Sequence, residues 1–168
     1  MTKSILIPIA VSLAFIAVTA VAQTVIKTTG DWSVLKYGSG KSRSCYIASA
    51  PQEETGNYKR RGDTFVMVTH RPGEGTRDVF ELRAGYSYKK DSAVTVVIDG
   101  QKFDLFTQGS TAWAKDDKTD SALARAMIRG RKMTVTGVSM RGTKTVDVYS
   151  LSGFTAAYKT IGRDCGVK

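Results

Sequence analysis

The chain has 168 residues and a formal net charge of +10, with 42% hydrophobic and 24% charged residues. It contains no internal repeat, low-complexity segment or Pro-rich linker, which excludes a repeat array and favours one domain. Beyond the N-terminal segment, no run of residues is apolar enough to span a bilayer. A chain of this length buries roughly 68–70% of its unfolded surface, enough for a substantial core.

The first 22 residues have the layout of a cleavable secretory signal. Lys3 supplies a positive charge, residues 4–19 are almost wholly apolar, and Ala20 and Ala22 are the small residues that a signal peptidase reads. An N-terminal membrane anchor is disfavoured, because the apolar run is shorter than ~20 residues and no basic stop-transfer segment follows it. The sequence predicts a signal peptide at 1–22, a domain at 23–168, and export to the periplasm, the outer membrane or the medium.

Cys45 and Cys165 are the only two cysteines of the chain. In an exported protein, two thiols most simply form one disulfide, for which Cα atoms about 4.4–6.8 Å apart are expected. The closed loop of about 120 residues corresponds to at most ~5 kcal/mol in the chain-entropy model. A catalytic thiol is disfavoured, because it needs a base beside it and His70 is the only histidine.

Alternation of apolar and polar residues predicts a mainly β chain. The Asp99-Gly100 pair between two alternating runs is a strong signal for a tight hairpin, and Arg141-Gly142-Thr143 is a second expected turn. In chain order, the expected strands are residues 31–37, 44–50, 65–68, 80–88, 94–98, 103–106, 133–138 and 145–149.

Two stretches change to the periodicity of a helix. Residues 119–129 are expected to form one helix, with Thr119 or Asp120 as its N-cap and Gly130 just past its end. Apolar residues spaced i, i+3, i+4 and i+7 predict a C-terminal helix near 154–161. Seven or eight short strands with two helices favour a two-sheet antiparallel β-sandwich, with a closed β-barrel as the alternative.

Candidate catalytic and metal-binding residues are few. His70 ends an apolar run before a turn, and no G-x-S-x-G motif accompanies it, so a strand-end histidine is favoured over a catalytic base. Asp116, Asp117 and Asp120 form the densest acidic cluster, but no Glu closes a calcium loop, which favours a role at the start of the helix. We therefore expect no catalytic set, no metal and no cofactor.

Basic residues form the other candidate site. Without residues 1–22, which contain only Lys3 among the charged residues, 24 basic and 15 acidic side chains remain, a formal charge of +9. Such a surface favours an anionic partner, while export argues against nucleic acid; the clusters are also of the kind that protects strand edges. The expected patch comprises Lys59, Arg60, Arg61, Lys89, Lys90, Arg129, Arg131 and Lys132. The tripeptide at residues 61–63 spells the integrin motif, but it is first interpreted as a turn.

Several segments together resemble the invasion-associated locus B family of exported bacterial proteins. They are residues 45–51 (CYIASAP), 68–72 (VTHRP), 77–79 (RDV), 84–88 (AGYSY), 98–100 (IDG), 111–114 (TAWA), 141–145 (RGTKT) and 149–157 (YSLSGFTAA). The resemblance spans about Trp32 to Gly166. It implies an envelope or secreted location, paired cysteines and a mainly β fold. The family takes its name from an association with host-cell invasion, which supplies no enzymatic activity and no catalytic residues.

The function expected from all of this is that of an exported, non-enzymatic binding protein of the cell envelope. Its partner would be an anionic envelope or host-surface component or another protein, with a role in host-cell association or invasion. The alternative is an envelope hydrolase or modifying enzyme centred on His70. That alternative requires His70 to line a concave pocket beside an acid or a hydroxyl.

Overall fold

The computed structural model describes residues 24–167, so the signal peptide expected at 1–22 lies outside the described residues. The strands in this range are β1 (Thr24–Thr29), β2 (Trp32–Tyr37), β3 (Ser44–Ser49), β4 (Glu53–Gly56), β5 (Phe65–Arg71), β6 (Thr76–Arg83), β7 (Val94–Ile98), β8 (Gln101–Gln108), β9 (Thr111–Trp113), β10 (Lys132–Val138) and β11 (Lys144–Ser150). The helices are α1 (Asp117–Arg129) and α2 (Phe154–Cys165).

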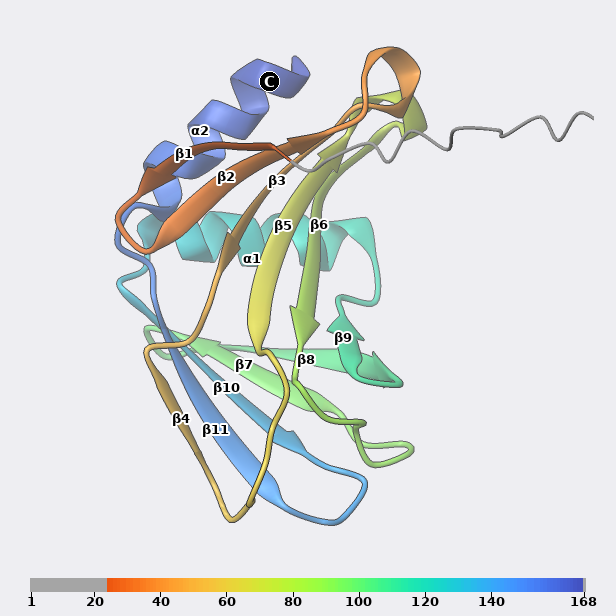
Figure 1. Ribbon diagram of the computed structural model, residues 1–168, viewed down its shortest axis with the longest axis vertical. Coiled ribbons are helices and arrows are strands. Elements are labelled where there is room, and N and C mark those ends of the chain that lie inside the picture. Colours follow the sequence, from red (N-terminus) through yellow and green to blue (C-terminus); the bar gives the residue numbers. More distant parts are fainter. Residues whose placement is uncertain (1–23, 168) are drawn as a thin grey trace, which may run out of the picture.

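All of these strands join in one antiparallel sheet, in the order β1-β2-β3-β5-β6-β9-β8-β7-β10-β11-β4. The sheet bends sharply at β8, whose first part pairs with β7 and whose last residues pair with β9. An upper half of β1, β2, β3, β5 and β6 therefore lies above a lower half of β7, β10, β11 and β4 (Figure 1). The mainly β, sandwich-like prediction is confirmed, and the open sheet rejects the closed barrel.

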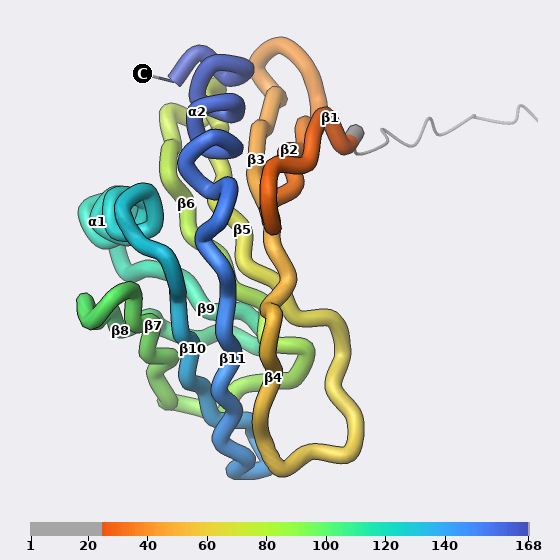
Figure 2. Tube along the Cα trace, turned by 90° about the vertical axis from the view of Figure 1, so that its left-hand side faces the viewer, coloured from red at the N-terminus to blue at the C-terminus, as the bar shows by residue number. Residues whose placement is uncertain are grey.

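The two helices cover the inner face of the bent sheet, as Figures 1 and 2 show from two sides. α1 packs on β6 and β8, while α2 packs on β1, β2, β3 and β5. The apolar face of α1 buries Leu123 and Met127, and that of α2 buries Phe154, whose ring lies 4.8 Å edge-on from Trp32. Both helices thus pack on the sheet through the apolar faces that the spacing of their residues predicted.

The tight turns expected from the sequence are confirmed. Asp99 and Gly100 have φ angles of +44° and +93° and join β7 to β8, as a two-residue hairpin turn requires. β10 and β11 form a regular antiparallel pair, and the Ser139 amide donates to the Thr143 carbonyl across their turn. Local turn chemistry therefore determined these parts of the fold.

Other expectations about the elements were wrong. The strand expected at 80–88 ends at Arg83, because the chain turns at Gly85 with a φ of +70°, and only Tyr88 re-enters the sheet through a bridge to Ser139. The N-cap of α1 is Asp116, whose carboxylate accepts from the Thr119 amide at 2.7 Å. Helix α2 continues through Gly162 to Cys165.

Three strands were not expected from the sequence. β4 is exposed at every residue and so shows no alternation of apolar and polar side chains. β9 has only three residues, which is too short for a periodic signal, and β1 ends the upper half with mostly exposed side chains. Each is defined by its pairing with a partner strand and not by its own pattern.

Candidate functional site

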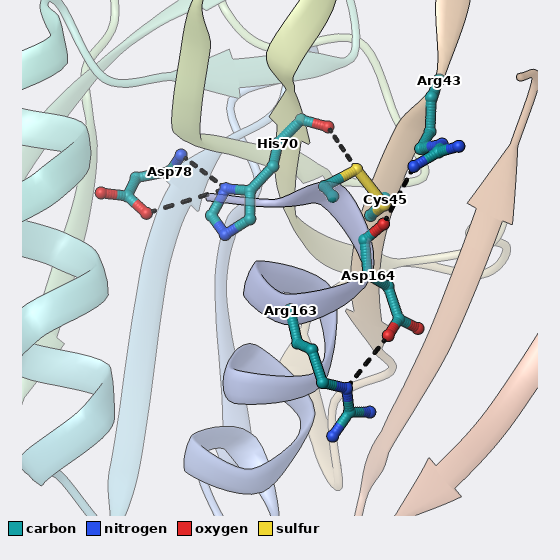
Figure 3. Close-up of a disulfide and its surroundings, with 7 residues drawn as sticks. Arg43, Cys45, His70, Asp78, Arg163 and Asp164 are labelled. Carbon is teal, nitrogen blue, oxygen red and sulfur yellow. Dashed lines mark hydrogen bonds and ion pairs between the residues drawn. A yellow bond between two sulfur atoms is a disulfide. The ribbon is translucent and has the colours of Figure 1, made fainter. Parts of the chain in front are cut away.

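The predicted disulfide between Cys45 and Cys165 is formed, with Cα atoms 6.0 Å apart. Cys45 lies on β3 directly opposite His70 on β5, and Cys165 is the last residue of α2. The bond therefore fixes the C-terminal end of α2 next to His70 (Figure 3). Arg43 adds a weaker tie here, because its Nη1 donates to the Asp164 carbonyl at 3.4 Å.

His70 is completely buried at the far end of β5. Its Nδ1 accepts a hydrogen bond from the Asp78 amide at 3.1 Å and lies 3.9 Å from the Asp78 carboxylate, as drawn in Figure 3. Burial lowers the pKa of His70, although the charge of Asp78 opposes this effect. The ring is therefore neutral at pH 7, and because Nδ1 accepts, its proton sits on Nε2.

Asp78 connects four elements through its buried carboxylate. Its oxygens accept from the Tyr158 hydroxyl of α2 at 2.5 Å, from the Ser121 hydroxyl of α1 at 3.0 Å and from Arg77 Nε at 3.3 Å. Burial, followed by the contact with Asp78, raises the pKa of Tyr158 to about 12. Asp78 has a φ of +61°, next to a register shift between β5 and β6. Such strained positions and bulges occur preferentially at functional sites.

A second buried carboxylate, Asp120, lies close to this cluster in the first turn of α1. It accepts from the Phe80 amide at 2.8 Å and thereby joins α1 to β6. Burial raises its pKa to about 6, while the hydrogen bond from Phe80 acts in the opposite direction. The acidic cluster at 116–120 thus serves as a cap and as a helix-to-sheet contact. Between Thr24 and Val167, no group of three His, Cys, Asp or Glu residues has the geometry of a metal site.

A larger pocket of about 790 Å³ lies at the opposite end of the molecule, in the lower half of the sheet. We call it the basic pocket. Its walls are the β4–β5 loop, the segment after β6 and the β10–β11 turn. Its lining residues are Asn57, Tyr58, Lys59, Arg60, Arg61, Tyr86, Ser87, Ser139, Met140, Arg141, Thr143 and Thr145. The lining includes four basic residues and no carboxylate.

Arg61 forms the floor of the basic pocket and is locked in place. Its Nη1 and Nη2 donate to the two carboxylate oxygens of Asp147 at 2.5 and 2.7 Å, and its Nε donates to the Ala84 carbonyl at 2.6 Å. Only 3% of the Arg61 side chain and 2% of the Asp147 side chain are exposed. Burial lowers the pKa of Arg61, but Asp147 outweighs this effect and raises it. Burial also raises the pKa of Asp147, while the hydrogen bonds and the charge of Arg61 oppose this effect. The two-point hydrogen bonding favours the charged form of both groups, which neutralise each other.

The basic residues expected to form one patch are separated by the structure. Lys59 and Arg60 are exposed at the basic pocket, and Lys89 and Lys90 follow close by, because the Lys89 amide donates to the Val138 carbonyl at 2.9 Å. Residues 129–132 contribute Arg129, Arg131 and Lys132 at the opposite end of β10, and we call these three the distal cluster. They do not belong to the same site.

Two further differences concern residues at the pocket itself. Arg61 cannot present its charge to a partner, so its place in the expected patch was wrong and the integrin-like tripeptide at 61–63 has no accessible arginine. Arg141, on the β10–β11 turn, lines the pocket but was not selected from the sequence. Arg141 lies at the pocket because the β10–β11 turn contacts the β4–β5 loop, some 80 residues away in the chain. The Thr143 hydroxyl, for example, donates to the Asn57 carbonyl.

The open antiparallel sheet, the clamped C-terminal helix and the basic pocket define a disulfide-bonded β protein with a positively charged recess. The sequence model of the family described as Invasion associated locus B (IalB) protein matches residues 32–162, and the chain belongs to this family. Comparison with curated proteins gave no match, and comparison with solved structures gave none either.

Two properties bear on where the protein works. A structural disulfide is typical of proteins that fold in an oxidising compartment outside the cytoplasm. Neither helix in the range 24–167 has the length and apolar character needed to cross a membrane.

Proposed function

We propose that the protein is an exported, non-enzymatic binding protein of the bacterial envelope that recognises an anionic partner through the basic pocket. The observation that carries this proposal is the pocket of about 790 Å³, in which Lys59, Arg60 and Arg141 surround a polar and aromatic lining without any carboxylate. Membership of the invasion-associated family supports a role in host-cell association.

The charge distribution explains why the basic pocket attracts anions. Asp147 neutralises Arg61 at the floor, so the uncompensated charges are those at the rim: Lys59, Arg60 and Arg141. A concave surface with one sign of charge concentrates the field and raises the local concentration of counter-charged groups. The hydroxyls of Ser87 and Thr143 in the lining offer hydrogen bonds to sulfate, phosphate or carboxylate oxygens.

Export is supported by two independent features. The N-terminal 22 residues have the charge, apolar run and small residues of a signal peptide. The disulfide requires oxidising conditions to persist. The periplasm, the outer membrane surface and the medium all meet that requirement.

A second candidate, an envelope hydrolase or modifying enzyme, is favoured by one observation. His70 lines a small cavity next to the Asp78 carboxylate and the Tyr158 hydroxyl. However, Nδ1 is occupied by a backbone amide and no hydroxyl is bonded to the ring in the described chain, so no activated nucleophile is assembled. Covalent labelling of Ser121 by a fluorophosphonate would favour the enzyme over the binding protein.

The proposal is tested by retention of the mature protein on heparin and lipopolysaccharide resins in a salt gradient. Two variants remove three positive charges each: Lys59→Gln/Arg60→Gln/Arg141→Gln at the basic pocket, and Arg129→Gln/Arg131→Gln/Lys132→Gln in the distal cluster. We expect the pocket variant to elute at distinctly lower salt than the distal variant, because only the former loses the charges that converge.

Two outcomes would contradict the proposal. Equal losses of retention in the two variants would show that only net charge matters. Elution of the wild-type protein at the salt concentration of an unrelated protein with the same charge would show that the surface has no selectivity for these anions.

A further inference from the structure

A second, smaller cavity lies beside His70, beneath the C-terminal end of α2. Its volume is about 260 Å³, and its lining includes His70, Arg77, Tyr158, Lys159 and Arg163. None of these residues lines the basic pocket, so the two sites are separate. We call it the His70 cavity.

The imidazole presents an unused hydrogen-bond donor to this cavity. Nδ1 accepts from the Asp78 amide, so Nε2 carries the ring proton. Within residues 24–167, Nε2 is buried and has no hydrogen-bond partner. A buried donor without an acceptor is costly and uncommon in folded proteins, so it calls for an explanation.

Within residues 24–167, no acceptor has hydrogen-bond geometry to Nε2. The Asp78 carboxylate lies on the Nδ1 side of the ring (Figure 3). It already accepts from the hydroxyls of Tyr158 and Ser121. At the end of α2, the carbonyls of Gly162 and Arg163 accept from the amides of Val167 and Gly166. A ligand in the cavity can supply the acceptor that Nε2 lacks.

The charges at the mouth indicate which acceptor that is. Arg77 and Arg163 each share one carboxylate, with Asp78 and Asp164, while the exposed Lys159 has no carboxylate partner among the described residues. An arginine has five N–H donors, so Arg163, whose Nε contacts Asp164, can also donate to a further oxygen. Arg77, which bonds to Tyr158 as well as to Asp78, contributes positive charge at the mouth. One imidazole N–H and three cationic side chains together match a small oxyanion.

We propose that the His70 cavity binds the carboxylate or phosphate group of a small ligand, with an oxygen of that group accepting from His70 Nε2–H. Arg77, whose side chain is 51% exposed, and Lys159 lie at the mouth of the cavity. This site is independent of the basic pocket and extends the protein's proposed role to a second, small anionic ligand.

Imidazole ¹H–¹⁵N spectra of the intact, oxidised mature protein test this site directly. Inorganic phosphate and, separately, acetate are titrated at constant ionic strength in chloride. We expect a saturable shift of the His70 Nε2–H signal with at least one of the two anions. Saturation by phosphate alone or by acetate alone supports the site and identifies its preferred group.

Single-charge variants at two places provide the control. Lys159→Gln removes an exposed charge at the cavity and is expected to weaken the binding about 2–5-fold, as an exposed charge contact allows. Lys132→Gln removes the same charge in the distal cluster and should leave the affinity unchanged. The proposal is overturned if neither anion shifts the Nε2–H signal, or if both variants weaken the binding equally.

Discussion

Two buried polar clusters at opposite ends of the molecule invite comparison. Around Arg61 and Asp147, all three nitrogens of the guanidinium donate to an acceptor, and both side chains are almost completely buried. Around His70 and Asp78, the carboxylate has three donors, but the imidazole has an unpaired Nε2. In the first cluster, which we call closed, every nitrogen of the guanidinium has a hydrogen-bond partner, whereas the second cluster keeps one unpaired hydrogen-bond donor.

The difference shows how the two clusters are used. An ion pair whose donors all have partners holds the surrounding segments in one arrangement, in this case the walls of the basic pocket. An unpaired, buried hydrogen-bond donor beside a cavity lowers the stability of the folded protein, and a ligand that accepts from it would explain why it is there. Because Arg61 lines the pocket, its position alone would suggest that it binds a ligand. Its three hydrogen bonds within the protein show instead that it has a structural role.

The largest expected loss of stability comes from removing the carboxylate that pairs with Arg61. Asp147→Ala leaves the Arg61 guanidinium buried without its partner, and we expect a loss of about 3–5 kcal/mol in the free energy of unfolding. Urea denaturation measures it. The matched control is Asp63→Ala, an exposed aspartate two residues from Arg61, which should change stability by no more than ~0.5 kcal/mol. Equal effects of the two variants would refute the structural role of the pair.

Removal of the disulfide affects the two regions unequally. The double variant Cys45→Ser/Cys165→Ser is expected to lose about 2–5 kcal/mol. Because the bond fixes α2 next to His70, the Nε2 proton should exchange with water much faster in this variant than in the wild type. Retention on heparin should be unchanged under conditions where the variant is folded. Faster exchange without lower stability, or lower retention without faster exchange, would contradict this assignment.

A pair of tyrosine variants compares the two clusters with the same chemical change. Tyr158→Phe removes the donor to the Asp78 carboxylate and is expected to cost about 1.5–3 kcal/mol, as for a hydrogen bond to a charged group. Tyr86→Phe removes a neutral bond to the Thr145 hydroxyl, and about 0.5–1.5 kcal/mol is expected. Thermal unfolding of both variants ranks the two bonds. The reverse order would show that Asp78 is not the hub of its cluster.

The pH dependence of Asp120 gives an effect of the opposite sign, a gain in stability. Its folded pKa of about 6 exceeds the model-peptide value of 3.8, so its carboxyl favours the folded state below pH 3.8 and loses this contribution as the pH rises through 6. Asp120→Asn should therefore be more stable than the wild type by about 1–2 kcal/mol at pH 7, with the gain vanishing near pH 4. Asp117→Asn, exposed in the same turn, is the control.

Chemical denaturation at several pH values measures this difference. His70 has the opposite sign, because its lowered pKa makes the folded protein lose stability as the pH falls below about 6.5. Subtracting the wild-type profile from that of Asp120→Asn removes the contribution of His70. A gain that is independent of pH would contradict the assigned shift.

Features with local signals were predictable from the sequence. The Asp99-Gly100 hairpin depends on two residues with positive φ, and α1 and α2 follow from apolar spacing over three turns. The disulfide followed from a count of two thiols. The exposed strand β4, by contrast, has no apolar pattern of its own and is defined by pairing with β11.

The candidate sites depended on contacts that no local pattern encodes. Arg61 and Asp147 are 86 residues apart, and Tyr158 and Asp78 are 80 apart. Of the lysine-arginine run at residues 59–61, Lys59 and Arg60 are exposed at the basic pocket, but Arg61 turns inward to meet the Asp147 carboxylate on β11. Charge patterns show where cations are in the chain, whereas the fold decides which of them are neutralised.

The basic pocket as the anion site is tested most directly by mapping a bound ligand on the protein. Amide ¹H–¹⁵N spectra of the mature protein are recorded during titration with a short heparin oligosaccharide at physiological salt. We expect saturable shifts that cluster at Tyr58 to Arg60, Ser87 and residues 139–143. Shifts centred on the distal cluster, or spread over all exposed basic residues, would contradict the account.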